Sequence, residues 1–533
     1  NRTASMRLSW ESASIAKEVI GRGYITTEAS NDASLITNYT HSKNIPFGRY
    51  AILSVETSSE GCLIQWQKSV DGKSWEDILG ANQKDYETRK FEESDSPVLY
   101  RCRVADVSNL NNILYAYTEI IRLPPAEPEV FYVSNSGSDA NDGKSWNASF
   151  SSLQKAITEA EKIGGGNIWV KAGEYDFGEA VELKSNVYIY GGFAGTEKSL
   201  EERVGGNETV ISGRGEHGIF KVNSQLNIEL EGLTLTKGKA DKGGAIYIES
   251  SEGIRLSGLK VIENESDSQI WVCNYSKVNI TDSQLSKNTG RGIGINGNTQ
   301  VEVDGSVFES NISNPSGGAI AAVNSSVVTI KDSEFIRNKS TGNEGGALSL
   351  DDNSSCTITG SLFEGNKAQR RGGAIYHSGS GIFINGCEFI NNEALYDKGG
   401  AICANGWTNM SYEDSTFIGN MAKSGGAIYS YSRYVGYGFL RNNTFSGNEA
   451  KDSLGDVITS DWNSNLTLLN CTVAENNTEG GRGSAISGNV SVKNCIVWGN
   501  GRYEGYKQIS SSLEVINSVV EGGYEGGTNI ITE

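Results

Sequence analysis

The chain is poor in proline and short of basic residues. Only 6 of its 533 residues are proline, whereas 65 are glycine, and this balance favours many tight turns between short strands. Three of the prolines, Pro124, Pro125 and Pro128, fall in one stretch and predict a stiff linker at 125–129.

The formal net charge is −19, since 65 acidic residues face 46 basic ones. This excess argues against nucleic acid and anionic membranes as partners, and a polyanionic glycan would need a local basic patch to bind. No run of 18 apolar residues exists, so we expect no membrane-spanning helix. The chain opens at Asn1 without a signal peptide, so we expect a processed or trimmed start; no cap is visible at the other end, so the natural protein can continue past Glu533.

Ten asparagines recur in register along the second half of the chain, 23 to 28 residues apart. Each closes the same phrase: an alternation of apolar residues, then Gly, Asp or Asn, a small residue, and an apolar residue just before the Asn. Copies ending at Gly238 and Gly523 keep the pattern without the Asn, which gives about twelve repeats. The ten are Asn264, Asn288, Asn311, Asn338, Asn366, Asn392, Asn420, Asn448, Asn476 and Asn500.

Each repeat predicts two or three short strands with one buried face, because hydrophobicity alternates with period two over few residues. Repeats of about 26 residues without a helical pattern predict an all-β fold, a right-handed parallel β-helix at 130–533 with about twelve coils near 176–525. One of the strands is expected at the phrase Gly-Gly-Ala-Ile, which starts at Gly243, Gly317, Gly372, Gly399 and Gly425, and as Gly-Gly-Ala-Leu at Gly345.

Two positions of the repeat have structural interpretations. We expect the asparagines to form a ladder in which each amide bonds to the same residue one coil away, rather than a row of ligands. A small residue, Ser or its near isostere Cys, is required two positions after the alternation. Cys471 and Cys495 share that position in adjacent coils, but stacked parallel side chains rarely suit a disulfide, so free thiols are favoured. No Cys-x-x-Cys spacing indicates zinc.

Residues 151–163 have apolar side chains at helical spacing and are followed by Gly164-Gly-Gly, which predicts an amphipathic helix. The end of a β-helix exposes strand edges and apolar rungs. We therefore interpret this helix as an N-terminal cap within 130–175.

The opening Phe131-Tyr-Val-Ser-Asn-Ser-Gly-Ser-Asp139, with the cap helix and Ile168-Trp-Val-Lys-Ala-Gly-Glu-Tyr175, resembles that of secreted bacterial right-handed β-helix proteins, polysaccharide lyases among them. The later repeats resemble those of chlamydial polymorphic membrane proteins, with Gly-Gly-Ala-Ile and Phe-x-x-Asn signatures such as Phe363-Glu-Gly-Asn366. Those repeats belong to adhesins. The resemblance covers about residues 130–525 and specifies the fold more than the activity.

Residues 45–124 resemble the immunoglobulin-like modules of large secreted proteins of Bacteroidetes-type bacteria. Ile64-Gln-Trp66 would supply the buried tryptophan of such a sandwich, and Tyr100 the tyrosine two positions before Cys102. Cys62 lies only four residues before Trp66, so the usual disulfide is in doubt; a bond between Cys62 and Cys102 across neighbouring strands stays open. Residues 1–44 are β-prone and unassigned.

A lyase of the β-helix type would need a base that removes the proton beside a uronate carboxyl and a cation that neutralises that carboxyl. Arg370, Arg371 and His377 lie in one coil and are the candidates, although charged residues in such a turn are commonly just solvated. Calcium has one candidate turn, with Asp139 and Asp142, for which a plain Asx-rich turn is the favoured interpretation because the spacing is not that of an EF-hand. No other cofactor is expected.

Aromatic residues crowd about three consecutive coils. If Ile428 faces inward, Tyr429 and Tyr431 face outward, where they could stack on sugar rings or anchor a protein. The alternative is that they cover loops near 405–410 and 431–438. The candidate binding residues are Trp407, Tyr429, Tyr431, Tyr434 and Tyr437.

The sequence as a whole predicts a secreted or bacterial cell-surface binding protein of adhesin or glycan-binding type, without enzymatic activity. Its expected partner is a glycan or a host or cell-surface protein. The alternative is a polysaccharide lyase that acts on a uronate-containing glycan.

Overall fold

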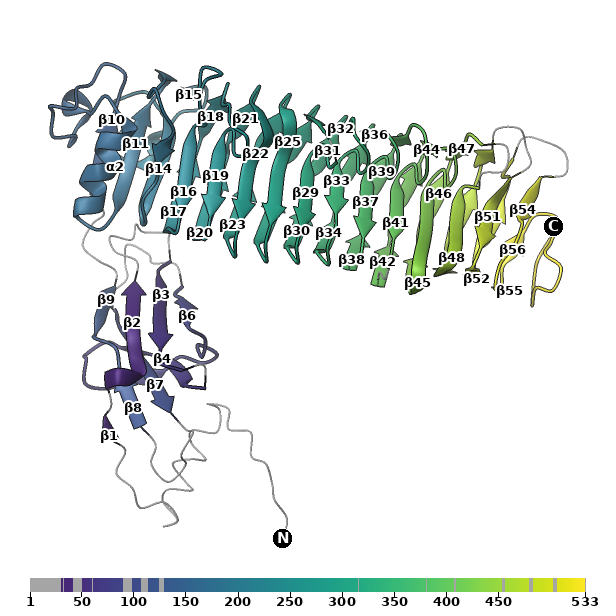
Figure 1. Ribbon diagram of the computed structural model, residues 1–533, viewed down its shortest axis with the longest axis horizontal. Coiled ribbons are helices and arrows are strands. Elements are labelled where there is room, and N and C mark those ends of the chain that lie inside the picture. The colour runs from purple at the N-terminus through teal and green to yellow at the C-terminus, as the bar shows by residue number, and fades with distance from the viewer. Residues whose placement is uncertain are drawn as a thin grey trace, which may run out of the picture. The chain divides into compact units, whose positions relative to one another are not determined.

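The computed structural model describes residues 30–31, 33–41, 50–59, 61–89, 98–106, 114–123, 129–314, 316–379, 381–406, 409–452, 456–478, 483–501 and 506–532. Most of the predicted segment 1–44, most of the predicted linker, Trp407 and the side chain of Tyr434 lie outside what it describes. The chain forms two compact units, an N-terminal pair of β-sheets and a β-helix (Figure 1).

The N-terminal unit consists of two sheets. One has the strand order β1-β8-β7-β4-β5, with β9 also paired to β7, and the other has the order β2-β3-β6. Strands β1 and β2 come from residues 30–41, within the segment left unassigned from the sequence. The strands are β1 (Ser30–Asn31), β2 (Ile36–His41), β3 (Ile52–Thr57), β4 (Leu63–Ser69), β5 (Glu76–Asp77), β6 (Asp85–Glu87), β7 (Val98–Asp106), β8 (Leu114–Tyr117) and β9 (Ile121–Leu123).

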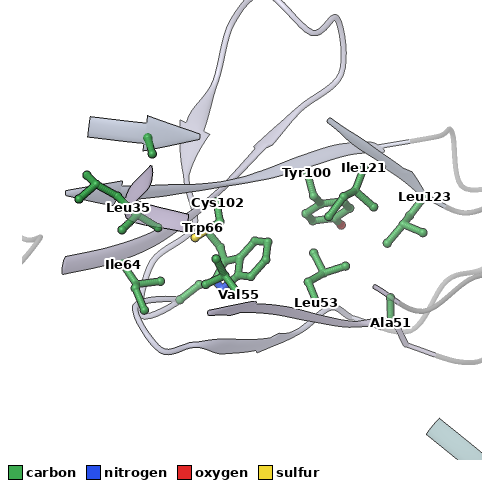
Figure 2. Packing of buried hydrophobic residues seen from close by; sticks show 13 residues of the cluster. Leu35, Ala51, Leu53, Val55, Ile64, Trp66, Tyr100, Cys102, Ile121 and Leu123 are labelled. Atoms are coloured by element: carbon green, nitrogen blue, oxygen red, sulfur yellow. The ribbon is translucent and has the colours of Figure 1, made fainter. Parts of the chain in front are cut away.

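The core of this unit surrounds Trp66, which is fully buried (Figure 2). Its indole N–H donates to the Gln83 carbonyl at 3.1 Å. Cys102 lies directly opposite Trp66 on the neighbouring strand, and Tyr100 is buried beside Tyr86. Cys62 and Cys102 are both free thiols, which settles the question of their pairing. The buried tryptophan fits an immunoglobulin-like sandwich, and that assignment stays a prediction.

The second unit is a parallel β-helix, as predicted, whose coils contribute strands to three faces. Face 1 holds the strands β13 (Val181–Glu182), β16 (Phe220–Asn223), β19 (Ile246–Glu249), β22 (Glu265–Cys273), β25 (Thr289–Asn296), β29 (Ile320–Val323), β33 (Leu348–Leu350), β37 (Ile375–Ser378), β41 (Ile402–Asn405), β51 (Ser484–Gly488) and β54 (Lys507–Ile509), and the first parts of β45 (Ile428–Arg441) and β48 (Ile458–Leu469). Face 2 holds the second parts of β45 and β48, and β11 (Gly166–Lys171), β14 (Val187–Phe193), β17 (Leu226–Glu231), β20 (Glu252–Ser257), β23 (Lys277–Thr281), β26 (Gln300–Asp304), β30 (Val327–Lys331), β34 (Ser355–Thr359), β38 (Gly381–Asn385), β42 (Asn409–Glu413), β52 (Val490–Lys493) and β55 (Glu514–Ile516).

Face 3 is a separate sheet of 14 short strands, the last twelve of which end the repeats identified in the sequence. Two coils, with β12 and β15, precede those repeats. The strands are β12 (Gly173–Tyr175), β15 (Thr209–Ser212), β18 (Leu233–Thr236), β21 (Lys260–Ile262), β24 (Gln284–Ser286), β27 (Val307–Glu309), β31 (Glu334–Ile336), β35 (Leu362–Glu364), β39 (Glu388–Ile390), β43 (Thr416–Ile418), β46 (Thr444–Ser446), β49 (Thr472–Ala474), β53 (Ile496–Trp498) and β56 (Val519–Val520).

The aligned asparagines form the predicted ladder. Each side-chain Nδ2 donates to the Oδ1 of the asparagine one coil further on, at 2.8–3.2 Å. The same Oδ1 also accepts the backbone N–H of the preceding ladder asparagine. The last residue, Asn500, donates to Gln508 Oε1 at 2.7 Å and so closes the row. Because every ladder asparagine is at most 3% exposed, these amides satisfy buried polar groups and are not available to a ligand.

Two further columns pack the interior of the coils. Six phenylalanines stack with centroids 4.6–4.9 Å apart, from Phe308 to Phe445. In most repeats the small residue accepts the backbone N–H of its counterpart in the preceding coil, as Ser306 Oγ does from Ser283 at 3.1 Å. Asn443 fills this position in one coil, and Cys471 and Cys495 remain free thiols as favoured.

The predicted cap helix is α2 (Leu153–Lys162). Ser152 Oγ accepts the Lys155 N–H at its start, and Gly165, whose φ is +131°, donates to the Ala160 carbonyl at its end. Leu153, Ala156 and Ile157 are fully buried, and Gln154 accepts the N–H of Glu182 in β13. No helix in the described part of the chain is long and apolar enough to cross a membrane.

Candidate functional site

Tyr429 and Tyr431 point outward from face 1, as predicted, because Ile428 faces the core. Tyr376, Cys403 and Tyr429 hold the same outward position in three successive coils, and with Tyr431 they pack into what we call the tyrosine cluster. Tyr429 is nevertheless only 2% exposed and Tyr376 only 4%. Although these side chains point outward, their rings are therefore not accessible to a ligand.

Cationic side chains from the turns before face 1 cover the cluster. Lys398 Nζ lies 4.0 Å from the centroid of the Tyr429 ring and donates to its hydroxyl, which in turn donates to Asp461. The Arg371 guanidinium lies 5.5 Å from the Tyr431 centroid and pairs with Asp397 at 3.1 Å and with Glu344 at 3.4 Å. Arg371 is thus held by two carboxylates and an aromatic face, and Lys398 by the ring and hydroxyl of Tyr429.

Burial dominates the electrostatics of this region. It raises the pKa of Asp351 to about 6, with the charge of Glu344 adding to the effect. It also raises the pKa of Glu344, against the attraction of Arg371. The pKa values of Tyr429 and Tyr431 are raised for the same reason, so both phenols stay neutral near pH 7 and are poor bases.

The structure separates the three residues proposed for lyase chemistry. Arg371 lies outside face 1 with both ion pairs formed, and Arg370 is half exposed, 3.7 Å from Asp397. His377 alternates with the outward Tyr376, so it is fully buried in the interior, where its Nε2 lies 2.8 Å from the hydroxyl of Tyr412. His377 therefore cannot act beside Arg371 on a substrate at the surface, which corrects the grouping inferred from the sequence.

The calcium candidates hold the local backbone. Asp139 accepts the backbone N–H groups of Ser151 and Ser152 and both their hydroxyls, and Asp142 accepts the N–H of Lys144. These hydrogen bonds lower the pKa of Asp139, although burial opposes them. Among the described residues no group of three or more His, Cys, Asp or Glu is arranged to hold a metal ion.

Three exposed aromatic side chains lie together on face 2. Tyr437 is 57% exposed, Phe439 49% and Phe383 38%, and together they border a hollow of about 380 Å³ that we call the aromatic groove. Phe383, Ser411 and Phe439 occupy one outward column in successive coils, so the two phenylalanines are about 10 Å apart with Ser411 between them. Gly381 leaves open space in the neighbouring column. The remaining lining residues are Ser355, Cys356, Thr357, Ile382 and Met410.

Of the predicted binding residues whose side chains the structure describes, Tyr437 alone belongs to this groove, and Phe383 and Phe439 were missed. A signal for both was present in the sequence. Their column otherwise carries polar residues, for example Thr329, Thr357 and Thr467, and an aromatic residue between two inward apolar positions breaks that pattern. The two phenylalanines are 56 residues apart, so their proximity becomes evident only when the coils are aligned.

Comparisons with known proteins agree with this architecture. Residues 200–335 match the family model of the right handed beta helix region, and residues 360–378 and 414–431 match the Chlamydia polymorphic membrane protein repeat. No curated protein is detectably similar to the chain.

Three solved structures are among those similar to the chain. The surface adhesin PfbA of Streptococcus pneumoniae is 14% identical, with a TM-score of 0.39 over 68% of this chain and 88% of that one. Tailspike protein 3 of bacteriophage CBA120 is 11% identical, with a TM-score of 0.39 over 75% and 59%. The A-module of the Azotobacter vinelandii mannuronan C-5 epimerase AlgE6 is 13% identical, with a TM-score of 0.32 over 72% and 94%. These similarities are too low to indicate a function. The chain thus contains a right-handed β-helix region with repeats similar to those of chlamydial polymorphic membrane proteins.

Proposed function

We propose that the protein is a non-enzymatic binding protein, secreted or displayed on a bacterial cell surface, that holds a glycan in the aromatic groove. One observation carries this proposal. Three large aromatic side chains stand 38–57% exposed around one hollow, on a sheet whose strands are hydrogen-bonded on both sides. A cluster of exposed apolar side chains on a rigid β-sheet is typical of a surface that binds a ligand.

The chemistry of the groove suits an uncharged sugar. Aromatic rings pack against the C–H face of a pyranose, and Ser355, Thr357 and Ser411 offer hydroxyls to its polar edge. Among the residues that the structure describes, no acidic or basic side chain lines the groove. A uronate carboxyl would therefore lose its hydration there without gaining a cation.

The same reasoning weighs against a lyase. Beside the tyrosine cluster, Arg371 is paired with two carboxylates, the phenols of Tyr429 and Tyr431 are neutral, and His377 faces the interior. Incubation with alginate, chondroitin and pectate, with ultraviolet absorbance as the measure of unsaturated products, tests this alternative directly. A steady rise in absorbance with any of the three would overturn the proposal.

Binding is tested on a glycan array with the wild-type protein and the variant Phe383→Ala/Phe439→Ala. Trp498→Ala, which removes an aromatic side chain that is 37% exposed on face 3, is the matched control. We expect the control to keep the wild-type signals and the double variant to lose them. Equal signals from the double variant and the wild type would contradict the proposal.

A further inference from the structure

Two consecutive coils have unusually short connections between face 3 and face 1. Between the ladder asparagine and the first inward residue of face 1 lie 8 residues after Asn311 (312–319) and 9 after Asn338 (339–347). Only 5 follow Asn264 (265–269) and only 4 follow Asn288 (289–292). Strands β22 and β25 run from just after the asparagine into face 1 without a break, whereas the next coil has a separate short strand, β28 (Ile312–Ser313), before its turn. The corner of the β-helix is therefore cut back in these two coils.

The missing turns leave a hollow of about 660 Å³, which we call the corner groove. Six successive coils contribute to it, so it extends over about 24 Å along the axis. Its lining consists of Glu216, Lys239, Ala240, Asp241, Glu265, Ser266, Asp267, Thr289, Gly290, Ile312, Ser313, Asn314 and Thr341.

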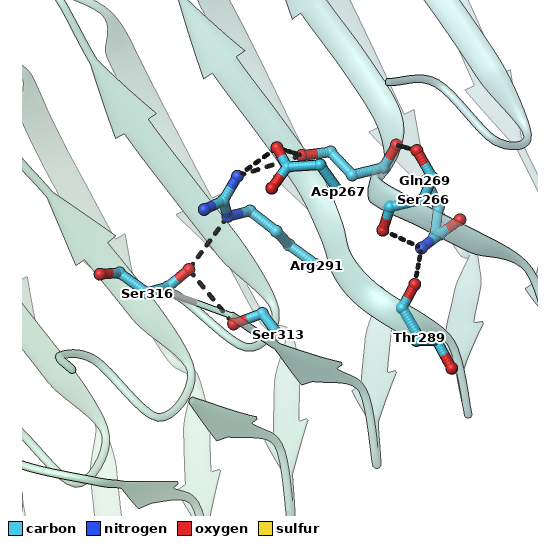
Figure 3. Close-up of polar contacts among 8 residues, drawn as sticks. Ser266, Asp267, Gln269, Thr289, Arg291, Ser313 and Ser316 are labelled. Carbon is cyan, nitrogen blue, oxygen red and sulfur yellow. Dashed lines mark hydrogen bonds and ion pairs between the residues drawn. The ribbon is translucent and has the colours of Figure 1, made fainter. Parts of the chain in front are cut away.

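A buried polar network holds the floor of this groove (Figure 3). Arg291 donates through Nη1 to Asp267 at 2.6 Å and through Nε to the Ser316 carbonyl at 3.0 Å, and its side chain is only 11% exposed. Gln269 is fully buried and donates to the carbonyls of Thr289 and Ser266 at 2.9 and 3.3 Å. The groove is therefore a preformed channel that does not need to open for a ligand.

A glycine is required where the two short turns meet. A Cβ on Gly290 would lie 1.6 Å from the Ser266 carbonyl oxygen, and the φ of Gly290 is +111°. Any other residue would therefore be strained at this φ and would force the Ser266 backbone away.

The charge of the corner groove excludes acidic ligands. Glu265 pairs with Lys239 at 3.0 Å and Asp267 with Arg291, while Glu216 and Asp241 have no ion-pair partner within the described part of the chain. The excess negative charge repels a uronate or sulfate. Carboxylates and the hydroxyl groups of Thr289 and Thr341 accept hydrogen bonds from sugar hydroxyls, and Ile312, 50% exposed, offers a surface for the ring face.

We propose that the corner groove is a second carbohydrate site, which binds an uncharged polysaccharide chain lying along the β-helix axis. An open channel lined from six coils suits a polymer rather than a single sugar, since each coil can contact the next ring. This site lies on a different edge of the coils from the aromatic groove and does not depend on it.

Affinity gel electrophoresis with xylan, mannan, β-glucan and dextran tests the proposal, with polygalacturonate as the charged comparison. Thr289→Trp fills the channel, and Glu216→Ala/Asp241→Ala removes two exposed acceptors without touching the floor. Glu388→Gln, an exposed acid on face 3, is the matched control. We expect at least one neutral polysaccharide to retard the wild type and the control, each groove variant to weaken the retardation at least tenfold, and polygalacturonate to have no effect.

The outcomes separate this site from the aromatic groove. Retardation that survives Phe383→Ala/Phe439→Ala but is lost in the corner-groove variants supports the proposal. Loss in the phenylalanine variant with normal binding by Thr289→Trp assigns the ligand to the aromatic groove and overturns it. Absence of retardation by all four neutral polymers, or equal retardation by polygalacturonate, also overturns it. Should Thr289→Trp fail to fold, Glu216→Ala/Asp241→Ala alone decides, because both side chains are exposed.

Discussion

The tyrosine cluster and the aromatic groove differ in accessibility although they share coils, residue type and outward direction. Tyr429 and Phe439 belong to the same strand, β45, yet the first is 2% exposed and the second 49%. The turns before face 1 carry Arg371 and Lys398, which extend over the tyrosines. The neighbours of Phe439 in its column are Ser411 and Thr467, which are too short to cover it. Burial on the outside of a β-helix is thus set by the turns, not by strand alternation.

The largest expected effect is on stability. Tyr429→Ala should lower the free energy of unfolding by about 3 kcal/mol, because it empties a buried site and leaves Asp461 and Lys398 without their shared hydroxyl. Phe439→Ala should change it by less than about 0.5 kcal/mol, as expected for a half-exposed side chain. Urea unfolding measures both. Similar losses in the two variants would remove the distinction between the surfaces.

Binding should show the reverse order. Phe383→Ala/Phe439→Ala should weaken glycan affinity by about 30-fold, which corresponds to about 1 kcal/mol for each stacked ring. Tyr431→Ala, in the covered cluster, should leave affinity unchanged while lowering the unfolding midpoint. Isothermal titration with an oligosaccharide identified on the array provides the measurement, and a stronger effect from Tyr431 than from the phenylalanines would place the site on face 1.

Adjacent arginines provide a smaller contrast. Arg371→Gln should destabilise the protein by about 1–2 kcal/mol, because it removes the ion pair of Glu344 and the shorter of the two arginine contacts of Asp397 in a partly buried setting. Arg370→Gln, at a half-exposed side chain, should cost less than about 0.5 kcal/mol. Thermal melts of the two variants at low salt test this difference. Equal melting temperatures would show that the ion pairs of Arg371 do not contribute to stability.

The smallest expected effect depends on pH. The pKa of Asp351 is raised from 3.8 to about 6, so the folded protein binds this proton more tightly than the unfolded chain. The resulting stabilisation is complete below the unfolded value and is lost as the pH rises through about 6. Asp351→Asn should therefore be more stable than the wild type at pH 7.5, by about 1 kcal/mol, and less dependent on pH between 4.5 and 7.5. Asp352→Asn, at an exposed neighbour, is the control. A wild type that gains stability steadily with pH over this range would contradict the assignment.

The fold was largely predictable because its determinants repeat. A ladder asparagine needs only its own phrase and the same phrase one coil away, so its role is visible in a linear pattern, and the cap helix is a local amphipathic segment. The role of Asn443 was not predicted, because this residue replaces the usual Ser or Cys. Its side-chain oxygen nevertheless accepts the backbone N–H of Ser415, as a serine hydroxyl would.

The binding surface was less predictable, because the conformation of the turns decides which outward side chains are covered. Strand alternation correctly placed Tyr429 outward, and the same alternation, applied from Ile375 through Tyr376, would have placed His377 in the interior. No local pattern shows that Lys398, 31 residues before Tyr429, folds over its ring. Contacts of this kind depend on turn conformation, which varies from one coil to the next.

The asparagine ladder makes each coil an interchangeable module. Every rung receives the same donors from the coil before it and offers the same donors to the coil after it. Duplication or loss of one whole repeat would therefore leave both junctions chemically matched. Each repeat gained or lost between the two grooves changes the distance between them by about 4.8 Å. The spacing of two ligand contacts can therefore evolve through a change in repeat number, without any substitution in either groove.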